Sequence, residues 1–195
     1  RLGLGEEALR VGKAALAAET DPEAKELQRR RLVALVDELA EAALAEGATA
    51  ETAAKVCQTL AVLGELTPEA QRDAAYYLKL GQMQLDRNLL ADAGASFAQA
   101  LEKAATDPEK NAALAGRLKA LRTLGEAQLD GGQAEAGQAS LVAALDVAKA
   151  QLAHEAKLLH LRAVRDLCRA TNRPQDILPA LKAFEAAAPA EKLVI

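Results

Sequence analysis

The sequence predicts an all-α protein built as a solenoid of stacked, antiparallel helical hairpins. Composition is the first reason: of 195 residues, 51% are hydrophobic but only 2% are aromatic, and most apolar residues are Ala and Leu, strong helix formers. Apolar residues also recur at helical rather than strand spacings. A third reason is that one pattern of small and large apolar residues returns at a nearly fixed distance, as in repeat proteins.

The first two predicted helices are joined by a short capping sequence. They cover residues 3–19 and 23–46, and the second carries its apolar side chains along one stripe. Between them, Thr20-Asp21-Pro22-Glu23 supplies a capping side chain, a proline suited to the first helical position and an acid for the first turn. Gly47 ends the second helix.

Further helices follow, which makes about nine in the whole chain. Their predicted ranges are residues 49–63, 67–86, 89–105, 107–129, 134–152, 154–170 and 175–187. Turn-forming residues separate several of them, including Asp86-Arg87-Asn88, Gly131-Gly132 and Asn172-Arg173-Pro174. Pro179 stands near the start of the last helix, so its true beginning can lie a few residues after residue 175.

The repeat is clearest between Leu78 and Leu101. Gly81 and Ala93 allow two helices to approach, and Phe97 fills the space beyond that contact. The same spacing returns 44 and then 43 residues later. The matching sets are Gly81, Ala93, Phe97 and Ala100; Gly125, Gly137, Leu141 and Ala144; and Cys168, Ala180, Phe184 and Ala187. Three copies in register favour a solenoid over a bundle.

These residues resemble the tetratricopeptide repeat, whose pattern joins an aromatic residue, a Leu-Gly pair and an Ala-x3-Phe-x2-Ala helix. Tyr77, Leu80-Gly81 and residues 93–100 match that pattern. The period here is about 43 residues, against about 34 in the family, so we expect each helix to be about one turn longer. The resemblance implies a right-handed superhelix forming a single domain over residues 1–195. Its expected units are a half repeat at about 1–20 and repeats at about 21–66, 67–106, 107–152 and 153–189.

Charge, hydropathy and cysteine content exclude several protein classes. The formal net charge of −4 argues against nucleic-acid binding, and no uncharged apolar run approaches the roughly 18 residues of a membrane span. Cys57 and Cys168 both fall on apolar stripes, which favours buried, reduced thiols in a cytoplasmic protein. The Ala-rich composition is associated with bacterial genomes. Because the chain begins with Arg1, we expect a fragment of a longer protein.

Catalytic and metal-binding patterns are sparse. His154 and His160 are six residues apart on one predicted helix, about 240° around its axis, so they are not placed to share a metal. Ser96 and Ser140 lie within helices and have no adjacent histidine to act as a base. Gly131-Gly132 does not follow a strand, unlike a phosphate-binding loop. We expect no enzyme and no cofactor.

The resemblance implies that the first helix of each hairpin lines a concave groove. Eight candidate binding residues lie on that face: Gln82; Lys119, Arg122 and Glu126; and Arg162, Arg165, Arg169 and Arg173. Leu78 and Leu85 are expected beside Gln82. Two interpretations stay open for the basic members. They form a patch that receives an acidic peptide or a carboxylate terminus, or a solvated face whose arginines pair with Glu126 or Asp166.

These features predict a protein–protein interaction scaffold that binds a peptide or partner protein in its groove. The alternative is an effector-sensing or oligomerisation domain of a bacterial signalling ATPase or transcription regulator, since long-period repeats resemble those domains. A third hypothesis is self-association through the chain ends. The first helix lacks a preceding hairpin mate, and the chain ends in the apolar Leu193-Val194-Ile195.

Overall fold

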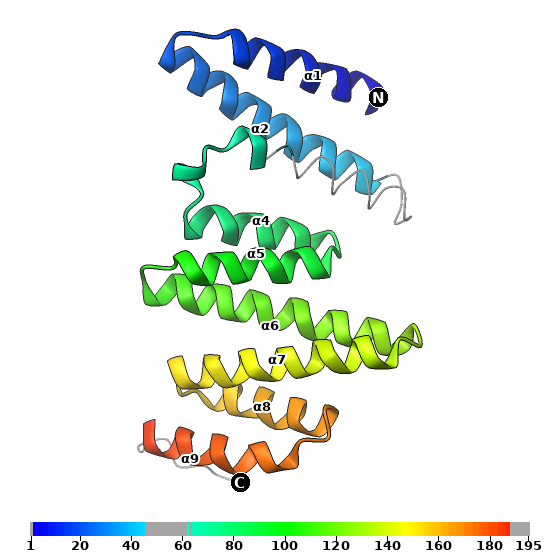
Figure 1. Ribbon diagram of the computed structural model, residues 1–195, viewed down its shortest axis with the longest axis vertical. Helices are drawn as coiled ribbons and strands as arrows, with labels where there is room; N and C mark the ends of the chain where they lie inside the picture. The colour runs from blue at the N-terminus through cyan, green and yellow to red at the C-terminus, as the bar shows by residue number, and fades with distance from the viewer. Residues whose placement is uncertain (1, 46–61, 63, 188–195) are drawn as a thin grey trace. The chain divides into compact units, whose positions relative to one another are not determined.

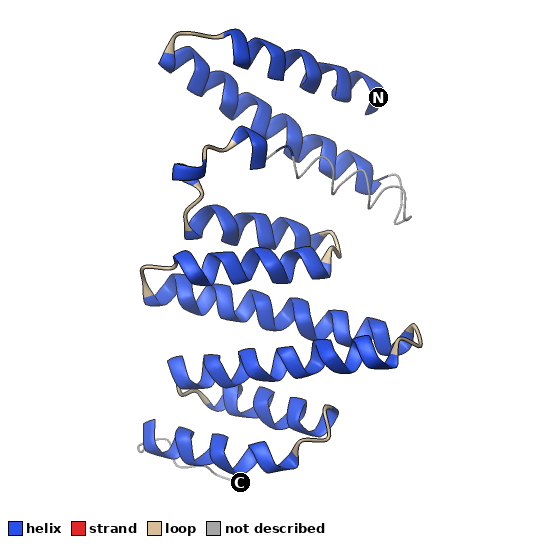
Figure 2. Cartoon of the chain, viewed as in Figure 1, coloured by secondary structure: helices blue, strands red, loops and turns tan. Residues whose placement is uncertain are grey.

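The structure is a computed structural model that describes residues 2–45, 62 and 64–187. This part of the chain is helical throughout, with turns between the helices and no β-strand (Figures 1 and 2). It belongs to two compact units, Arg1–Arg72 and Asp73–Ile195. Among the helices described, none has the length and hydropathy required to span a membrane.

The first unit begins with an antiparallel pair, α1 (Leu2–Ala18) and α2 (Pro22–Ala45), close to the predicted ranges (Figure 1). Leu32 of α2 is buried, and its side chain fills the space beside Gly12 of α1. Asp21 caps α2, because its carboxylate accepts the backbone N–H of Ala24 at 3.3 Å. The structure therefore confirms the capping sequence between the first two helices.

The next part of the first unit differs from the prediction. The helix expected at residues 49–63, and Cys57 within it, lie almost entirely outside the described residues, although residues 64–66 are helical. Only the first part of the helix expected at residues 67–86 differs: it is a separate 3-10 turn, η1 (Glu69–Gln71), and the α-helix begins at Ala74. The Arg72 guanidinium donates hydrogen bonds to the carbonyl oxygens of Gly64 and Thr67, which satisfies helix-end acceptors and holds this interruption.

The described part of the second unit consists of helices that each run antiparallel to the one before and pack against it (Figure 1). They are α4 (Ala74–Asp86), α5 (Leu90–Lys103), α6 (Asp107–Asp130), α7 (Ala134–His154), α8 (Leu158–Ala170) and α9 (Ile177–Ala187). The predicted start of a helix at residue 154 is wrong. The α7 helix continues through His154, and a turn follows in which the carbonyl oxygen of Glu155 accepts hydrogen bonds from Lys157 and His160.

The turns that follow α4, α6 and α8 share one backbone geometry. Each contains a residue with a positive φ angle: Asn88 at 57°, Gly132 at 76° and Asn172 at 53°. The next N–H in each turn bonds the carbonyl five residues earlier, as Leu89 to Gln84, Gln133 to Gln128 and Arg173 to Cys168. Glycine and asparagine are the residues that most readily adopt this left-handed helix cap. The three hairpins therefore turn in the same way.

Phe97 of α5 lies at the contact between α4, α5 and α6. Its side chain is only 2% exposed, and a Cβ atom on Gly81 of α4 would stand 3.0 Å from its ring. A Cβ atom on Gly116 of α6 would overlap the same ring. Ala93 and Ala120 complete the cluster and are fully buried. The sequence predicts that Phe97 fills the space beyond the approach of Gly81 and Ala93; the structure places its ring directly against Gly81, and Gly116 accommodates the ring from the other side.

The third hairpin departs from the first two. Gly81 and Gly125 each precede the positive-φ residue of their turn by seven positions, whereas Cys168 precedes Asn172 by four. The α8 helix therefore ends about one turn earlier than the aligned repeat predicts. A 3-10 turn, η2 (Pro174–Asp176), follows α8. Its three residues make up for the shortening of α8, so α9 keeps the position that the repeat predicts. Ala180 and Phe184 are buried, as the repeat predicts.

Candidate functional site

The helix α4 carries the first predicted site residue. Gln82 is exposed, and its side-chain amide donates a 2.6 Å hydrogen bond to Asp86 on the same helix. Leu78 and Leu85 pack against the cluster formed by Ala93, Phe97 and Ala120. Each leucine is half-buried and covers the core next to the aromatic ring with part of its side chain.

The helix α6 carries three candidates, of which two pair with each other. The Arg122 guanidinium donates a 2.8 Å hydrogen bond to Glu126, one helical turn further on, and both side chains are about half exposed. Lys119 is exposed on the same helix. Exposed pairs of this kind stabilise a helix by only about 0.3–0.5 kcal/mol, so Arg122 can exchange Glu126 for another carboxylate at little cost.

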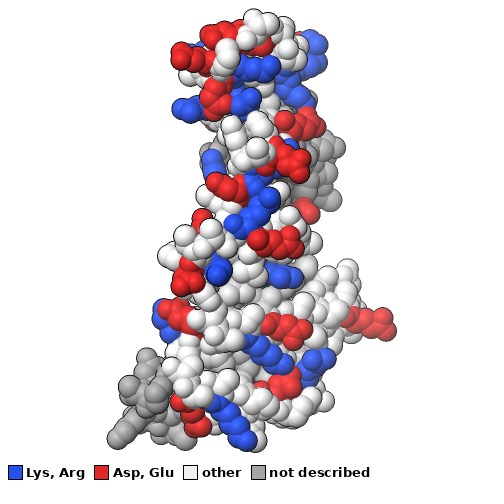
Figure 3. Space-filling model, turned by 60° about the vertical axis from the view of Figure 1, so that its left-hand side comes forward, with Lys and Arg blue, Asp and Glu red and all other residues white. Residues whose placement is uncertain are grey.

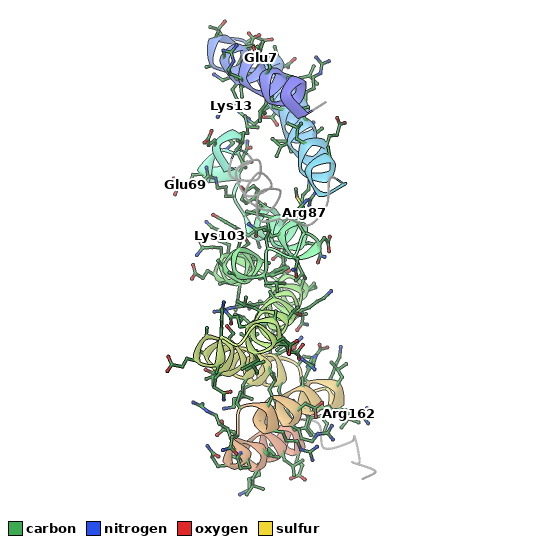
Figure 4. All side chains as sticks on the ribbon, turned by 90° about the vertical axis from the view of Figure 1, so that its right-hand side faces the viewer. Glu7, Lys13, Glu69, Arg87, Lys103 and Arg162 are labelled. Carbon is green, nitrogen blue, oxygen red and sulfur yellow. The ribbon has the colours of Figure 1, made fainter. Side chains whose placement is uncertain are left out.

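The helix α8 presents an arginine stripe, defined here as Arg162, Arg165 and Arg169. All three are exposed, and Arg165 bonds the neighbouring Asp166 at 2.8 Å. Within the part of the chain that the structure describes, Arg162 and Arg169 make no side-chain hydrogen bond or ion pair. Figure 4 shows Arg162 at the outer edge of the helices. The stripe therefore offers two guanidinium groups whose donors face solvent.

Arg173 does not extend this stripe. The α8 helix ends at Ala170, and the left-handed Asn172 redirects the chain before Arg173, which is half-buried. Burial raises the pKa of the Cys168 thiol, and the charge of Arg173 is a smaller influence that lowers it. The spacing of three, four and four residues places Arg173 on the same face as the other arginines only in a continuous helix. Because α8 ends at Ala170, the helix does not reach Arg173.

The candidates of α6 and α8 are not brought together. The α4 helix contacts α6, as expected for the first helices of neighbouring hairpins, but α6 packs chiefly on α5 and α7. In the next hairpin the additional contact is instead between α7 and α9. No hydrogen bond or ion pair among the described residues joins α6 candidates to α8 candidates. Basic and acidic side chains are interspersed over the face shown in Figure 3.

The two histidines lie on either side of the turn between α7 and α8. His160 is buried, and its Nδ1 lies 2.7 Å from the carbonyl oxygen of Glu155, so this nitrogen carries the proton. His154 faces the Asp107 carboxylate across 3.9 Å. The described residues contain no group of three side chains suited to hold a metal ion. Both histidines thus have structural neighbours at the turn between α7 and α8.

Sequence reasoning missed a cleft between α7 and α9. Its volume is about 240 Å³, and its lining residues are Lys149, Leu152, Ala153, Asp176, Pro179, Ala180 and Ala183. Lys149 and Asp176 form a 2.6 Å ion pair at this cleft. None of the lining residues belongs to α8, which packs on α7 and α9 through the opposite side from its arginines. The direct contact between α7 and α9 creates this site.

Comparison of the chain with models of protein families, with curated protein sequences and with solved structures found no match.

Proposed function

We propose that this chain is a protein–protein interaction scaffold of the tetratricopeptide-like solenoid type, rather than an enzyme. Stacked antiparallel hairpins with tightly packed small residues provide a stiff support, as scaffolds of stacked repeats require. The proposed ligand is an acidic segment of a partner protein, and the proposed binding surface is the arginine stripe of α8.

The main support for this proposal is that Arg162 and Arg169 are exposed and form no hydrogen bond or ion pair with other described residues. A guanidinium presents five N–H donors in a fixed plane, which suits bidentate binding of a carboxylate. The opposite face of α8 is fixed in the core, because Val164 and Cys168 are fully buried. A partner carboxylate therefore meets side chains whose helix is already held in place, and this lowers the entropic cost of binding.

The arrangement also predicts how a ligand would compete with internal pairs. Arg165 is held by Asp166, but that pair is nearly half exposed, so an incoming carboxylate can share or replace it at low cost. Binding through exposed charges weakens as ionic strength rises, because the Debye length shortens to about 8 Å at physiological salt. The stripe is thus expected to favour rapid, salt-sensitive association.

A fluorescence anisotropy titration with a labelled Glu-rich peptide tests this proposal. We expect Arg169→Glu to weaken binding about tenfold, because attraction at the stripe becomes repulsion. Lys182→Glu is the matched control, since Lys182 is also exposed and the net charge changes equally. Equal binding by the two variants would contradict a role for the stripe and would leave only a solvated helix face.

A further inference from the structure

The exposed face of α8 carries an aliphatic side chain in line with the arginines. Leu159 is 61% exposed, more than any other large apolar side chain among the described residues. It precedes Arg162 by three positions, a spacing that places two side chains next to each other on a helix. The opposite face of α8 is held in the core by Val164 and Leu167. One end of the exposed face therefore combines an apolar contact with the guanidinium of Arg162.

The uncompensated charge of this face lies at its two ends. In the middle, the Arg165 guanidinium donates from Nε at 2.9 Å and lies at 2.8 Å through Nη2, in both cases to one oxygen of Asp166. This pair neutralises the centre of the face. Arg162 and Arg169, on either side of it, have no carboxylate partner among the described residues. A ligand with two carboxylates therefore gains most by placing one of them at each end.

The spacing of the two ends favours a helical ligand. Arg162 and Arg169 are seven residues apart, so they are separated by about 10.5 Å along the α8 axis and by only about 20° around it. A second helix presents carboxylates seven residues apart at the same spacing, as in the salt bridges between the helices of coiled coils. In an extended strand, side chains on one face are about 6.8 or 13.6 Å apart, because successive side chains alternate between faces. A helix therefore fits the two arginines better than an extended segment does.

From these observations we infer that the exposed face of α8 binds a helix of a partner protein that carries two Glu or Asp residues seven positions apart. An aliphatic residue of that helix lies three positions beyond one of the acidic residues, on the side away from the other. The two carboxylates meet Arg162 and Arg169, and the aliphatic side chain covers Leu159. This inference rests on the proposed acidic ligand of the arginine stripe and adds the conformation and the spacing of that ligand.

Two labelled peptides of identical composition test the spacing against the whole chain by fluorescence anisotropy at low salt. The probe is acetyl-Ala-Leu-Ala-Gln-Glu-Ala-Gln-Ala-Ala-Gln-Ala-Glu-Ala-Gln-Leu-Ala-amide, in which a Leu lies outside each Glu so that either helix direction fits. In the control, the second Glu exchanges places with the Gln two residues before it, which sets the carboxylates about 140° apart around the helix. We expect the probe to bind about fivefold or more tightly than the control. Equal affinities would overturn the inference.

A third peptide tests the conformation of the ligand. It replaces one of the two central Ala residues of the probe by Pro, which breaks the helix between the carboxylates without changing their number or order. We expect this peptide also to bind about fivefold or more weakly than the probe. If it binds as tightly as the probe, the ligand is not bound as a helix and the inference is wrong.

A matched pair of variants tests the apolar contact. Leu159→Gln removes the aliphatic side chain from the exposed face of α8, whereas Leu178→Gln makes the same change on α9, where Leu178 is similarly exposed at 57%. Both side chains lie mostly in solvent and glutamine is a good helix former, so both variants should keep the fold. We expect Leu159→Gln alone to weaken binding of the probe, by about threefold or more. Equal affinities of the two variants for the probe would contradict the inference.

The variant with Arg162→Glu and Arg169→Glu separates this inference from the proposed function. If all three peptides bind the unchanged protein equally and none binds this variant, the stripe receives acidic segments without regard to their spacing. The inference is then wrong and the proposed function holds. If neither the probe nor a Glu-rich peptide binds the unchanged protein, both are wrong. Binding of the probe that the variant leaves unchanged would place the peptide elsewhere on the chain and would also overturn the inference.

Discussion

Gly125 of α6 and Gly137 of α7 meet so closely that a Cβ atom on either would stand within 3.0 Å of the other's carbonyl oxygen. Leucine side chains close the same contact, with Leu141 beside Gly125 and Leu129 beside Gly137. The backbones of α6 and α7 therefore pack here without an intervening side chain. Small residues at such contacts are a property of packing and carry no ligand preference.

The first prediction concerns this contact. Gly125→Ala should lower the free energy of unfolding by about 1–3 kcal/mol, because the added methyl group has to displace Leu141 and a backbone carbonyl. Gly94→Ala is the control, since its nearest neighbour would be a Leu121 methyl group at an ordinary 3.7 Å. Helix propensity should then stabilise that variant by up to about 1 kcal/mol. Urea unfolding followed by circular dichroism measures both, and equal effects would contradict the close approach.

The second prediction concerns Phe97 and Gly116. Phe97→Ala should destabilise the fold by about 3–5 kcal/mol through the cavity it leaves, and Gly116→Ala should destabilise it because its methyl group overlaps the ring. The double variant should be more stable than the sum of the two changes predicts, by about 1 kcal/mol or more, since the new methyl group fills part of the cavity. Additive effects in denaturant unfolding would show that the two residues do not touch.

The third prediction concerns pH and the start of α6. Glu109 and Thr106 form a reciprocal capping box: the Glu109 carboxylate accepts the Thr106 N–H at 3.0 Å, and the Thr106 hydroxyl accepts the Glu109 N–H at 3.4 Å. Hydrogen bonds from the Thr106 backbone, the Thr106 hydroxyl and the Ala105 backbone hold the pKa of Glu109 below its usual 4.5. A lowered carboxyl pKa contributes stability above pH 4.5 that is lost as pH falls through the folded pKa.

The measurement is the unfolding free energy as a function of pH. Glu109→Gln keeps a capping-box partner but has no titrating proton, so its stability should fall less steeply below pH 4.5 than that of the unchanged protein. Thr106→Ala should reduce the acid dependence in part, because it removes only the hydroxyl group. If the unfolding free energy falls equally below pH 4.5 in all three proteins, the Glu109 carboxyl does not contribute to the acid dependence of stability.

The sequence predicted most helices and their closest contact because these depend on local chemistry. Asp21 and Thr106 both cap helices, although they occupy different positions in the same four-residue motif. The spacing from Gly81 to Phe97 could be read directly, since facing positions across a hairpin follow from helical geometry. Thr67 and Pro68 looked like another helix start, but hydrogen bonds from the Arg72 side chain end that turn early.

The rest depended on contacts between hairpins that no local pattern encodes. The sequence predicts the end of this helix at residue 170 and a turn at Asn172-Arg173-Pro174, and the structure confirms both. The apolar spacing around Cys168 and Phe184 does not encode η2, which was not predicted. Because the helix ends before Arg173, that residue does not belong to the stripe. The cleft beside Lys149 was missed because it requires α7 and α9 to touch, which is a consequence of how three helices pack.

A charge-exchange experiment tests the proposed binding role of the arginine stripe most directly. Affinities of Glu-rich and Lys-rich peptides are measured for the unchanged protein and for the variant with Arg162→Glu and Arg169→Glu. The proposal predicts that the unchanged protein prefers the Glu-rich peptide and that the variant prefers the Lys-rich peptide, each by about tenfold or more at low salt. An unaltered preference in the variant would contradict it.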